Sequence, residues 1–521
     1  MITTFKPLGR ALFLGALAAG GADAQLSLSW TDGVLGSQVV YEFEGDPLEV
    51  FALLPSFENG PTPLALVDPL DPRILAVGID LVSLLQVGFL SPAGQGSAVF
   101  PLPPNPLLSG AILYAQALTL PGNPTLADDV SNPTQFVLSL EGETHLALGN
   151  NAEARQFATA TELPDGRILV AGGQTPGAGP AFHDSWELYD PNTQTFTPGG
   201  SSLPEARSRH TASLLPDGSV LLLGGIGAGG ALASGVRYDP GTDQAAAIAP
   251  MSVARVMHTA TVLDDGQVLV AGGSSGFAAA HPIGYPASFQ PPVSNGTEIY
   301  DPLGDCWKPG PPLPGGLTGH RASKLANGRV LIAGGVQVPG AGTPTTQATC
   351  HLFDPGSGLL LPAPPLPLPA SFQSQIALNG GGASVAGGMQ LDFNNVTSSE
   401  NATLFLYDEV ANVWNPGPPP PFVVRCKEVK CLDGPGGTRY KYTGGMKNFD
   451  LLTGAMTPET SVTRLDLTTN SWQVVGGLLA GRPGLAVAVT QDQLRLVVVG
   501  SSSTGGPGPQ DTSAEVYTAD F

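Results

Sequence analysis

The stretch VLVAGG at residues 268–273 decides the fold of this chain, because it recurs six more times in recognisable form. Each copy is a short apolar run that ends in a glycine pair, and the last copy is degraded. The other copies are ILVAGG (168–173), VLLLGG (220–225), VLIAGG (330–335), ASVAGG (383–388), YKYTGG (440–445) and RLVVVGS (495–501). Successive copies are 48 to 62 residues apart. A period near fifty is typical of repeat proteins in which each repeat is one small β-sheet.

The segments around each copy predict a four-stranded sheet. A strand of small residues such as HTASLL (210–215) comes first, and a tight turn such as Pro216-Asp217-Gly218 follows it. Asp-Gly and Asn-Gly accept the positive φ that a two-residue hairpin needs. The apolar run is the second strand, and a third strand ends in an aromatic residue followed by Asp and often Pro, which stops the strand. Aromatic residues mark the fourth strand at Phe196, Trp307, Trp414 and Trp472, whereas Ala245 occupies this place in the second repeat and predicts looser packing there.

These motifs resemble the kelch-repeat family and the propeller of the galactose-oxidase superfamily. The resemblance covers about residues 144–521 and implies an all-β, seven-bladed kelch-type β-propeller. The last repeat stops at its third strand, AEVYTADF (514–521). We therefore expect residues 144–150 to close the last blade as its fourth strand, because this removes two exposed sheet edges at once.

The segment before the repeats divides into two parts. Residues 1–24 are typical of a signal peptide, with Lys6 and Arg10 before a short apolar stretch and a small-x-small pattern at Ala22-Asp23-Ala24. A membrane anchor is the alternative interpretation of this stretch. Residues 25–140 alternate short apolar runs with Pro, Gly and Asn, which favours a β-rich, sandwich-like N-terminal domain. The predicted location is therefore secreted or extracytoplasmic.

The charge balance excludes some partners. The chain has 43 acidic and 22 basic residues and a net charge of −21. Nucleic acid and anionic membranes are disfavoured as partners of so acidic a protein. Apart from the N-terminal stretch, we find no segment long and apolar enough to predict a membrane span.

Two sets of residues recur at the start of the predicted first strands. The first set lies ten residues before the Asp of the turn, or before the residue in its place. It consists of Arg155, Arg207, Arg255, Leu317, Pro369, Val423 and Arg482. Four adjacent arginines on an acidic chain would suit a carboxylate or an acidic sugar. The alternative is that these arginines serve packing and loop hydrogen bonds, as they commonly do in kelch repeats.

The second set holds Ala158, His210, His258, His320, Phe372, Cys426 and Leu485. Three histidines on consecutive repeats are weak candidates for a metal site, because imidazole is a common metal ligand. The resemblance to galactose oxidase implies a copper site with a Tyr-His pair at this place. Here Arg209, Met257 and Gly319 precede the histidines, so copper is disfavoured and we predict no cofactor.

Long connections between the second and third strands, together with those that lead to the next repeat, should gather on one side, the loop face. The longest, residues 274–296, carries His281 and Tyr285 and is a candidate for contact with a partner. The function we predict is a binding protein that recognises a protein or glycan through this face, over the first four repeats. The alternative is a carbohydrate-active enzyme on the same scaffold, an oxidase or a sugar mutarotase or epimerase. The pairing of Cys306, Cys350, Cys426 and Cys431 stays open.

Overall fold

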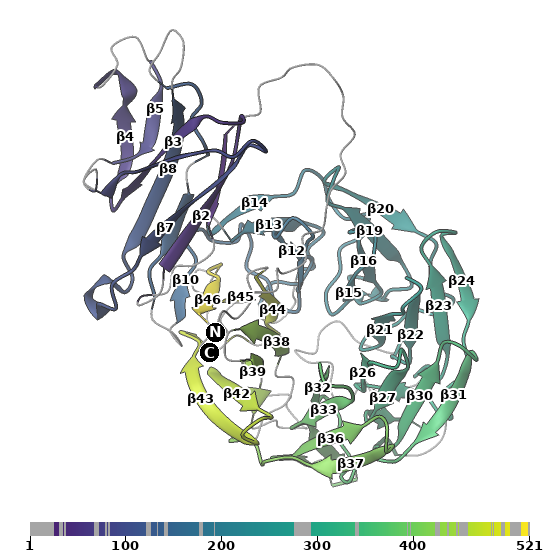
Figure 1. Ribbon diagram of the computed structural model, residues 1–521. Helices are drawn as coiled ribbons and strands as arrows, with labels where there is room; N and C mark the ends of the chain where they lie inside the picture. Colours follow the sequence, from purple (N-terminus) through teal and green to yellow (C-terminus); the bar gives the residue numbers. More distant parts are fainter. Residues whose placement is uncertain are drawn as a thin grey trace. The chain divides into compact units, whose positions relative to one another are not determined.

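The computed structural model is almost entirely β-structure (Figure 1). It describes residues 26–518 with gaps at 31–34, 36–37, 67–71, 79–80, 82–83, 121–126, 133, 140–143, 177–180, 192, 276–292, 339–342, 393, 396, 422–427, 435–436, 444–445, 448–456, 481, 483, 491–494 and 501–511. The expected signal peptide therefore lies outside the described residues, as do His281 and Tyr285. No helix among the described residues is both long and apolar enough to span a bilayer.

The Cα positions divide the chain into two compact units. One draws on residues up to Trp30, on Val40–Val99 and on Tyr114–Thr134, and the other on Thr31–Val39, Phe100–Leu113 and Gln135–Phe521. The two units are therefore interleaved along the sequence before residue 135.

The first unit holds most of two sheets and a hairpin. One sheet has the order β6 (Gln86–Phe89), β3 (Val50–Ser56), β8 (Ile112–Leu120) and β9 (Thr134–Val137). The other has the order β1 (Ser27–Trp30), β2 (Gln38–Glu44) and β7 (Gln95–Pro101), and β4 (Asn59–Pro63) pairs with β5 (Ile74–Val77). Two short 3-10 helices, η1 (Leu64–Leu66) and η3 (Pro106–Leu108), connect strands. Phe43 and Phe51 stack at 4.1 Å between their ring centroids.

In the described part of the second unit, seven four-stranded antiparallel sheets follow one another. Sheet 1 is β11 (Thr159–Glu162), β12 (Ile168–Ala171), β13 (Trp186–Asp190) and β14 (Thr195–Pro198), and sheet 2 is β15 (Thr211–Leu214), β16 (Val220–Leu223), β19 (Gly235–Asp239) and β20 (Gln244–Ile248). Sheet 3 is β21 (Thr259–Val262), β22 (Val268–Ala271), β23 (Thr297–Asp301) and β24 (Cys306–Pro309), and sheet 4 is β26 (Arg321–Lys324), β27 (Val330–Ala333), β30 (Cys350–Asp354) and β31 (Leu359–Ala363).

The remaining three sheets follow the same order. Sheet 5 is β32 (Ser374–Ala377), β33 (Ala383–Ala386), β36 (Leu404–Asp408) and β37 (Val413–Pro416), and sheet 6 is β38 (Glu428–Gly434), β39 (Gly437–Thr443), β42 (Ser461–Asp466) and β43 (Ser471–Gly477). Sheet 7 is β44 (Ala486–Val489), β45 (Arg495–Val499), β46 (Glu515–Thr518) and β10 (Thr144–Leu146). In sheet 7, Thr144 is the register partner of Tyr517.

The seven sheets form a propeller-like arrangement (Figure 1). The first strand of each sheet lies beside the first strand of the next, and β44 of sheet 7 lies beside β11 of sheet 1. The apolar runs form the second strands, and β12, β16, β22, β27 and β33 are buried at every position. A strand that is covered on both faces has no reason to alternate apolar with polar residues.

Small sheets extend the connections that follow the glycine pairs. A hairpin joins β17 (Ile226–Gly227) to β18 (Gly230–Ala231), and another joins β40 (Met446–Lys447) to β41 (Thr457–Pro458). A five-stranded sheet links the connections of sheets 4 and 5 in the order β25 (Leu317–Thr318), β28 (Val336–Gln337), β29 (Thr345–Thr346), β34 (Met389–Asp392) and β35 (Thr397–Glu400).

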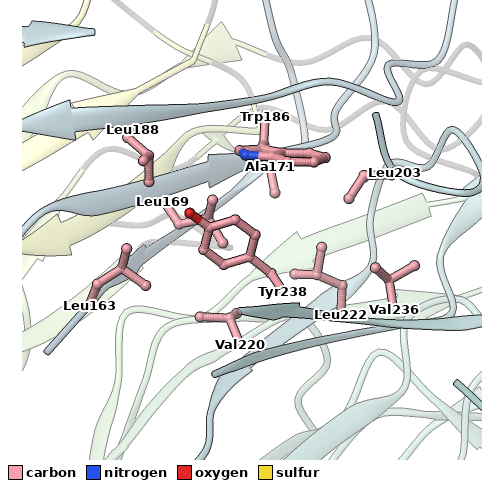
Figure 2. Close-up of a cluster of buried hydrophobic side chains, with 10 residues drawn as sticks. All are labelled: Leu163, Leu169, Ala171, Trp186, Leu188, Leu203, Val220, Leu222, Val236 and Tyr238. Atoms are coloured by element: carbon pink, nitrogen blue, oxygen red, sulfur yellow. The ribbon is translucent and has the colours of Figure 1, made fainter. Parts of the chain in front are cut away.

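Side chains from neighbouring sheets interdigitate, and Figure 2 shows this between sheets 1 and 2. Trp186 of β13 is 1% exposed and meets Tyr238 of β19 edge to face, with ring centroids 5.7 Å apart. Ala245 packs against the same cluster. Ala245 therefore lies against a buried cluster that includes Trp186, and the looser packing expected at this place stays a prediction.

The outer strands are also joined from sheet to sheet by hydrogen bonds. Trp307 Nε1 donates to the carbonyl of Ala249 in the preceding sheet at 2.8 Å, and Trp414 and Trp472 make the matching contacts to Pro364 and Pro418. The fourth-strand tryptophans of the sequence motif therefore connect consecutive sheets.

Candidate functional site

The glycine pairs end the second strands where the backbone comes close to two neighbouring segments. A Cβ on Gly224 (φ +58°) would lie 2.6 Å from the carbonyl oxygen of Arg255 and 2.8 Å from Cε1 of His258, both in the next repeat. A Cβ on Gly225 (φ +94°) would lie 2.5 Å from the carbonyl oxygen of Ser208. Glycine is required at both places, because a side chain would be strained in φ and would collide with backbone. This crowding brings the arginine and histidine positions of adjacent sheets together.

The four candidate arginines are all buried, and their exposed fractions are 0 to 1%. Arg155 donates from Nη1 to the carbonyl of Gly172 at 2.7 Å and pairs with Glu187 at 3.0 Å. In the same way Arg255 pairs with Glu298, and Arg482 pairs with Glu515, each at 2.7 Å. These groups are committed to contacts within the chain, which favours the packing role for them over ligand binding.

Arg207 differs from the other three arginines, because Val236 occupies the place that Glu187 holds in sheet 1. Its Nη1 donates to the carbonyls of Gly224 and Ser234, at 3.0 and 3.1 Å. Burial lowers the pKa of Arg207 to about 10. Arg207 therefore joins strand ends through carbonyl oxygens without a buried carboxylate partner of the Glu187 type.

Glu187, Glu298 and Glu515 balance three of the arginines and were not among the residues expected at the site. A signal for them is present, because each glutamate stands two residues before the tyrosine of the third strand, in WELYD (186–190), TEIYD (297–301) and AEVYT (514–518). The second repeat has GVRYD (235–239) in this place and so lacks the glutamate.

The three candidate histidines bind the preceding sheet and not one another. His210 Nε2 lies 2.9 Å from Thr159 Oγ1, and His258 and His320 make the same contact at 3.1 Å with Thr211 and Thr259. Burial lowers the pKa of all three to about 3, so they are neutral at physiological pH. Each imidazole therefore faces a different strand, which does not fit a shared metal.

Other metal-ligating side chains of the described residues are also dispersed. In the described part of the chain, no three His, Cys, Asp or Glu side chains lie close enough to hold a metal ion. The Tyr-His pair of a copper oxidase is also missing, since Arg209, Met257 and Gly319 precede the histidines. The described residues therefore do not fit a copper centre of that kind. Cys306 is exposed and Cys350 is buried, and both are free.

One position of sheet 5 differs from the register that we expected. Gln373, not Phe372, occupies the histidine place. A Cβ on Gly224 would meet the imidazole of His258, and in the same way a Cβ on Gly334 would meet Nε2 of Gln373. The arginine place is shifted as well. The carbonyl of Arg255 accepts a hydrogen bond from Gly225 N–H, and in sheet 5 the carbonyl of Ala370, not that of Pro369, accepts the matching bond from Gly335 N–H. The shift arises in the turn, where Gly381 (φ +94°) takes the place that Gly218 has in sheet 2.

The residues immediately before the histidine position form a second set, which we call the entry ring. Six of them lie in the described part of the chain, and these six have a left-handed backbone, with φ between 54° and 63°. The entry ring consists of Phe157, Arg209, Met257, Gly319, Phe372 and Gly484. Non-glycine residues rarely adopt this conformation, and runs of such residues cluster at functional sites.

Backbone hydrogen bonds connect members of the entry ring from one sheet to the next. Phe157 N–H donates to the carbonyl of Gly484 at 2.7 Å, and Arg209 N–H donates to the carbonyl of Phe157 at 3.0 Å. Phe372 N–H donates to the carbonyl of Gly319 at 2.9 Å. The ring therefore follows the first strands of the sheets at the loop face.

The side chains of the entry ring stack on their neighbours. Arg209 Cζ lies 3.8 Å from the ring centroid of Phe157. This is a cation–π contact, in which the aromatic face attracts the positive charge. Arg209 Nη1 also donates to Gln174 Oε1 at 2.6 Å, and burial lowers the pKa of this arginine to about 9. Phe157 lies over Gly484, and Phe372 lies over Gly319, where a Cβ would come within 2.4 Å of the phenyl ring in both cases. Phe157, Arg209 and Met257 remain partly exposed, so they offer a surface of two apolar side chains and one cation.

A polar cluster lies next to this surface in sheet 1. Glu153 binds Arg155 Nη2 at 3.1 Å and His183 Nδ1 at 3.0 Å, and it accepts a hydrogen bond from Ser185. Burial alone would raise the pKa of Glu153, but these three neighbours lower it. Burial and the charge of Arg155 lower the pKa of His183. The cluster fixes the end of the 174–185 connection, part of which lies outside the described residues.

Comparisons with known proteins support the fold and go no further. No family model matches this chain, and no curated protein matches it. A solved structure of a fungal alcohol oxidase, described as having catalytic diversity among the AA5 family and being in complex with copper, is 14% identical with a TM-score of 0.53, over 72% of this chain and 76% of that one. The structure of YjhT is 14% identical with a TM-score of 0.45, over 62% of this chain and 98% of that one. The similarity to the alcohol oxidase supports a propeller-like fold for the described chain.

Proposed function

We propose that this chain is a secreted, seven-bladed kelch-type propeller that binds a protein or glycan ligand at its loop face. The entry ring carries this proposal. It places Phe157, Arg209 and Met257 side by side at the start of three consecutive first strands, and all three are partly exposed. Apolar and aromatic surfaces with a few placed polar groups are typical of ligand sites. The proposed binding site therefore lies over sheets 1 to 3.

The buried arginines support the proposal indirectly. Arg155, Arg255 and Arg482 are each paired with a glutamate of their own sheet. An acidic ligand would have to displace these pairs, and breaking a buried pair is costly. Arg209, which stacks on Phe157 and donates to Gln174, is the cation that the described entry ring would offer to a carboxylate or sulfate of a ligand. An anionic ligand remains within the proposal for this reason.

The experiment is a screen of the purified protein against glycan and peptide arrays, followed by titration of the best ligand. Phe157→Gly and Arg209→Met remove one side chain each, and glycine and methionine occur naturally in this ring at Gly319 and Met257. We expect each change to weaken binding at least about tenfold, which corresponds to about 1.4 kcal/mol. Arg167→Met, in the turn between β11 and β12 at the opposite strand ends, is the matched control and should leave affinity unchanged. Ligand binding that survives both ring variants would exclude the entry ring as the site.

The enzymatic alternative has a direct test. The copper-bound alcohol oxidase shares this fold at low identity, and similarity at that level fixes no chemistry. Metal analysis of the purified protein and an oxidase assay with galactose and glyoxal decide between the two functions. Stoichiometric copper or peroxide production would replace the binding function with an oxidase.

A further inference from the structure

An exposed apolar strip lies on the first unit. In β6, Val87 is 61% exposed and Phe89 is 75% exposed. Leu48 is 66% exposed and adjoins them, because its N–H donates to the carbonyl of Ser91 just after β6. Leu84 and Leu85, immediately before β6, are also exposed. Single exposed apolar residues are ordinary, but a contiguous group marks an interaction surface.

The strip is the uncovered continuation of a buried core. Val87 and Phe89 are register partners of Ala52 and Val50 in β3, so they share a face of the sheet with them. Ala52 is buried there against Leu75, Val77 and Leu118. Gly88 faces the other side of the sheet, where the ring of Phe51 leaves no room for a Cβ. The core face is therefore covered over β3 and β8 but open over β6.

β6 is also an edge strand. In the described residues it pairs with β3 on one side, and no strand pairs with its other edge. Natural edge strands are usually protected by charged residues, proline or a bulge. Gln86–Phe89 contains no charge and no proline. Such an edge can accept another strand, which would continue the ladder.

The charge distribution indicates what covers the strip. Residues 81–127 contain no Asp, Glu, Lys, Arg or His, although the whole chain has a net charge of −21. A charged partner would find no complementary group on this segment. Two copies of so acidic a chain repel each other elsewhere, but they can approach along a segment that carries no charge in either copy.

We propose that two copies of this chain form a two-fold dimer in which Gln86–Phe89 of one copy runs antiparallel beside the same strand of the other. Such pairing brings Val87 and Phe89 of each copy against the same residues of its partner, which are the cross-strand contacts that stabilise sheets. The surface is self-complementary, as a two-fold interface requires. The four-stranded sheet of the first unit becomes an eight-stranded sheet that spans both copies.

The test is the mass of the purified protein in solution, measured by light scattering and sedimentation at about 1 to 100 μM, where a micromolar dissociation constant is visible. We expect twice the chain mass at the upper end. Phe89→Glu and Val87→Glu should each give the single-chain mass, because each places a carboxylate against an apolar side chain of the partner strand. Leu303→Glu, at a residue that is 97% exposed in the second unit, is the control and should stay dimeric.

Folding is checked separately, so that loss of the dimer is not confused with loss of structure. Circular dichroism and the unfolding midpoint of the Phe89→Glu variant at low protein concentration should match those of the wild type. A wild type that stays at single-chain mass at 100 μM, or a dimer that survives both β6 variants, would overturn the proposal.

Discussion

His258 Nε2 lies 3.1 Å from Thr211 Oγ1, and this contact joins the start of sheet 3 to the first strand of sheet 2. His210 and His320 repeat the contact with Thr159 and Thr259. In sheet 5 Gln373 takes the same place and donates from Nε2 to the carbonyl of Ala333 at 2.7 Å. An amide can therefore replace the imidazole, which indicates that the position serves to connect sheets and does not depend on acid–base chemistry.

The first prediction concerns pH. The pKa of His258 in the folded protein is lowered to about 3, whereas the unfolded chain titrates near its usual 6.5. Above pH 6.5 both states are neutral and stability is unaffected. As the pH falls from 6.5 toward 3, only the unfolded state binds the proton, so each such histidine destabilises the fold by about 1.4 kcal/mol per pH unit. Urea unfolding at pH 7.5 and pH 5.0 measures the loss.

The matched variant is His258→Gln, since glutamine occupies this place in sheet 5. It should keep the stability at pH 7.5 within about 1 kcal/mol, because one hydrogen bond is exchanged for another. Between pH 7.5 and pH 5.0 it should lose about 2 kcal/mol less than the wild type. An identical loss in both proteins would show that His258 does not titrate as its burial implies.

The second prediction tests the glycine pairs. Gly224→Ala should destabilise the protein by at least about 2 kcal/mol, because the added Cβ collides with a backbone carbonyl and φ is positive. Gly229→Ala is the control, since nothing lies within 4 Å of a Cβ at that position. Urea unfolding midpoints of the two variants decide the point. Equal midpoints would mean that the chain relaxes around residue 224 at little cost.

The sequence predicted the sheets well because their signals are local. The apolar run 220–223, the turn at Asp217-Gly218 and Gly224-Gly225 all lie within ten residues, and each has its own steric reason. Phe372 is the wrong residue for the histidine place in sheet 5, because the turn is one residue later than Asn379-Gly380, with Gly381 in the left-handed conformation. In the sequence, Asn379-Gly380 and Gly380-Gly381 fit the turn equally well. The hydrogen bond from Gly381 N–H to the carbonyl of Leu378 shows that the second pair forms it.

The candidate site was harder to predict because its contacts are not local. Arg155 and Glu187 are 32 residues apart, and only the fold shows that they form a buried pair. Arg209 and Phe157 hold the same position in consecutive repeats, but the repeat period alone does not show that their side chains stack on each other. In the sequence, Arg209 stands out only as a departure from a Tyr-His pair. The role of the entry ring required the backbone conformation, which no motif encodes.

The third prediction concerns the buried pair of Arg255 and Glu298. Arg255→Met should cost about 3–5 kcal/mol, because it leaves the carboxylate of Glu298 buried without a partner. The double change Arg255→Met with Glu298→Leu should recover most of that loss, since two apolar groups then replace two charges. Arg207→Met should cost less, about 1–3 kcal/mol, because Val236 leaves no buried carboxylate behind. Arg167→Met on the surface is the control, and equal losses in all variants would contradict this account.

The last prediction concerns residues 144–150. Ala147 N–H donates to the carbonyl of Ala514 at 2.9 Å, and β10 pairs with β46 through three residues. All four residues of β46 are buried, with exposed fractions of 0%. Replacing residues 144–150 with a Gly-Ser linker of equal length keeps the connection but removes the strand. It should uncover Val516 and Tyr517 in part and lower the free energy of unfolding by about 3 kcal/mol or more.

The same replacement should also change the behaviour of the protein in solution. It leaves β46 as an unprotected edge, so aggregation should rise on gentle heating. Light scattering during a thermal ramp measures this directly, and the wild type is the reference. A melting temperature equal to that of the wild type would mean that the first and last sheets hold together through β11 and β44 alone, and that the strand from residues 144–150 is not needed to close the arrangement.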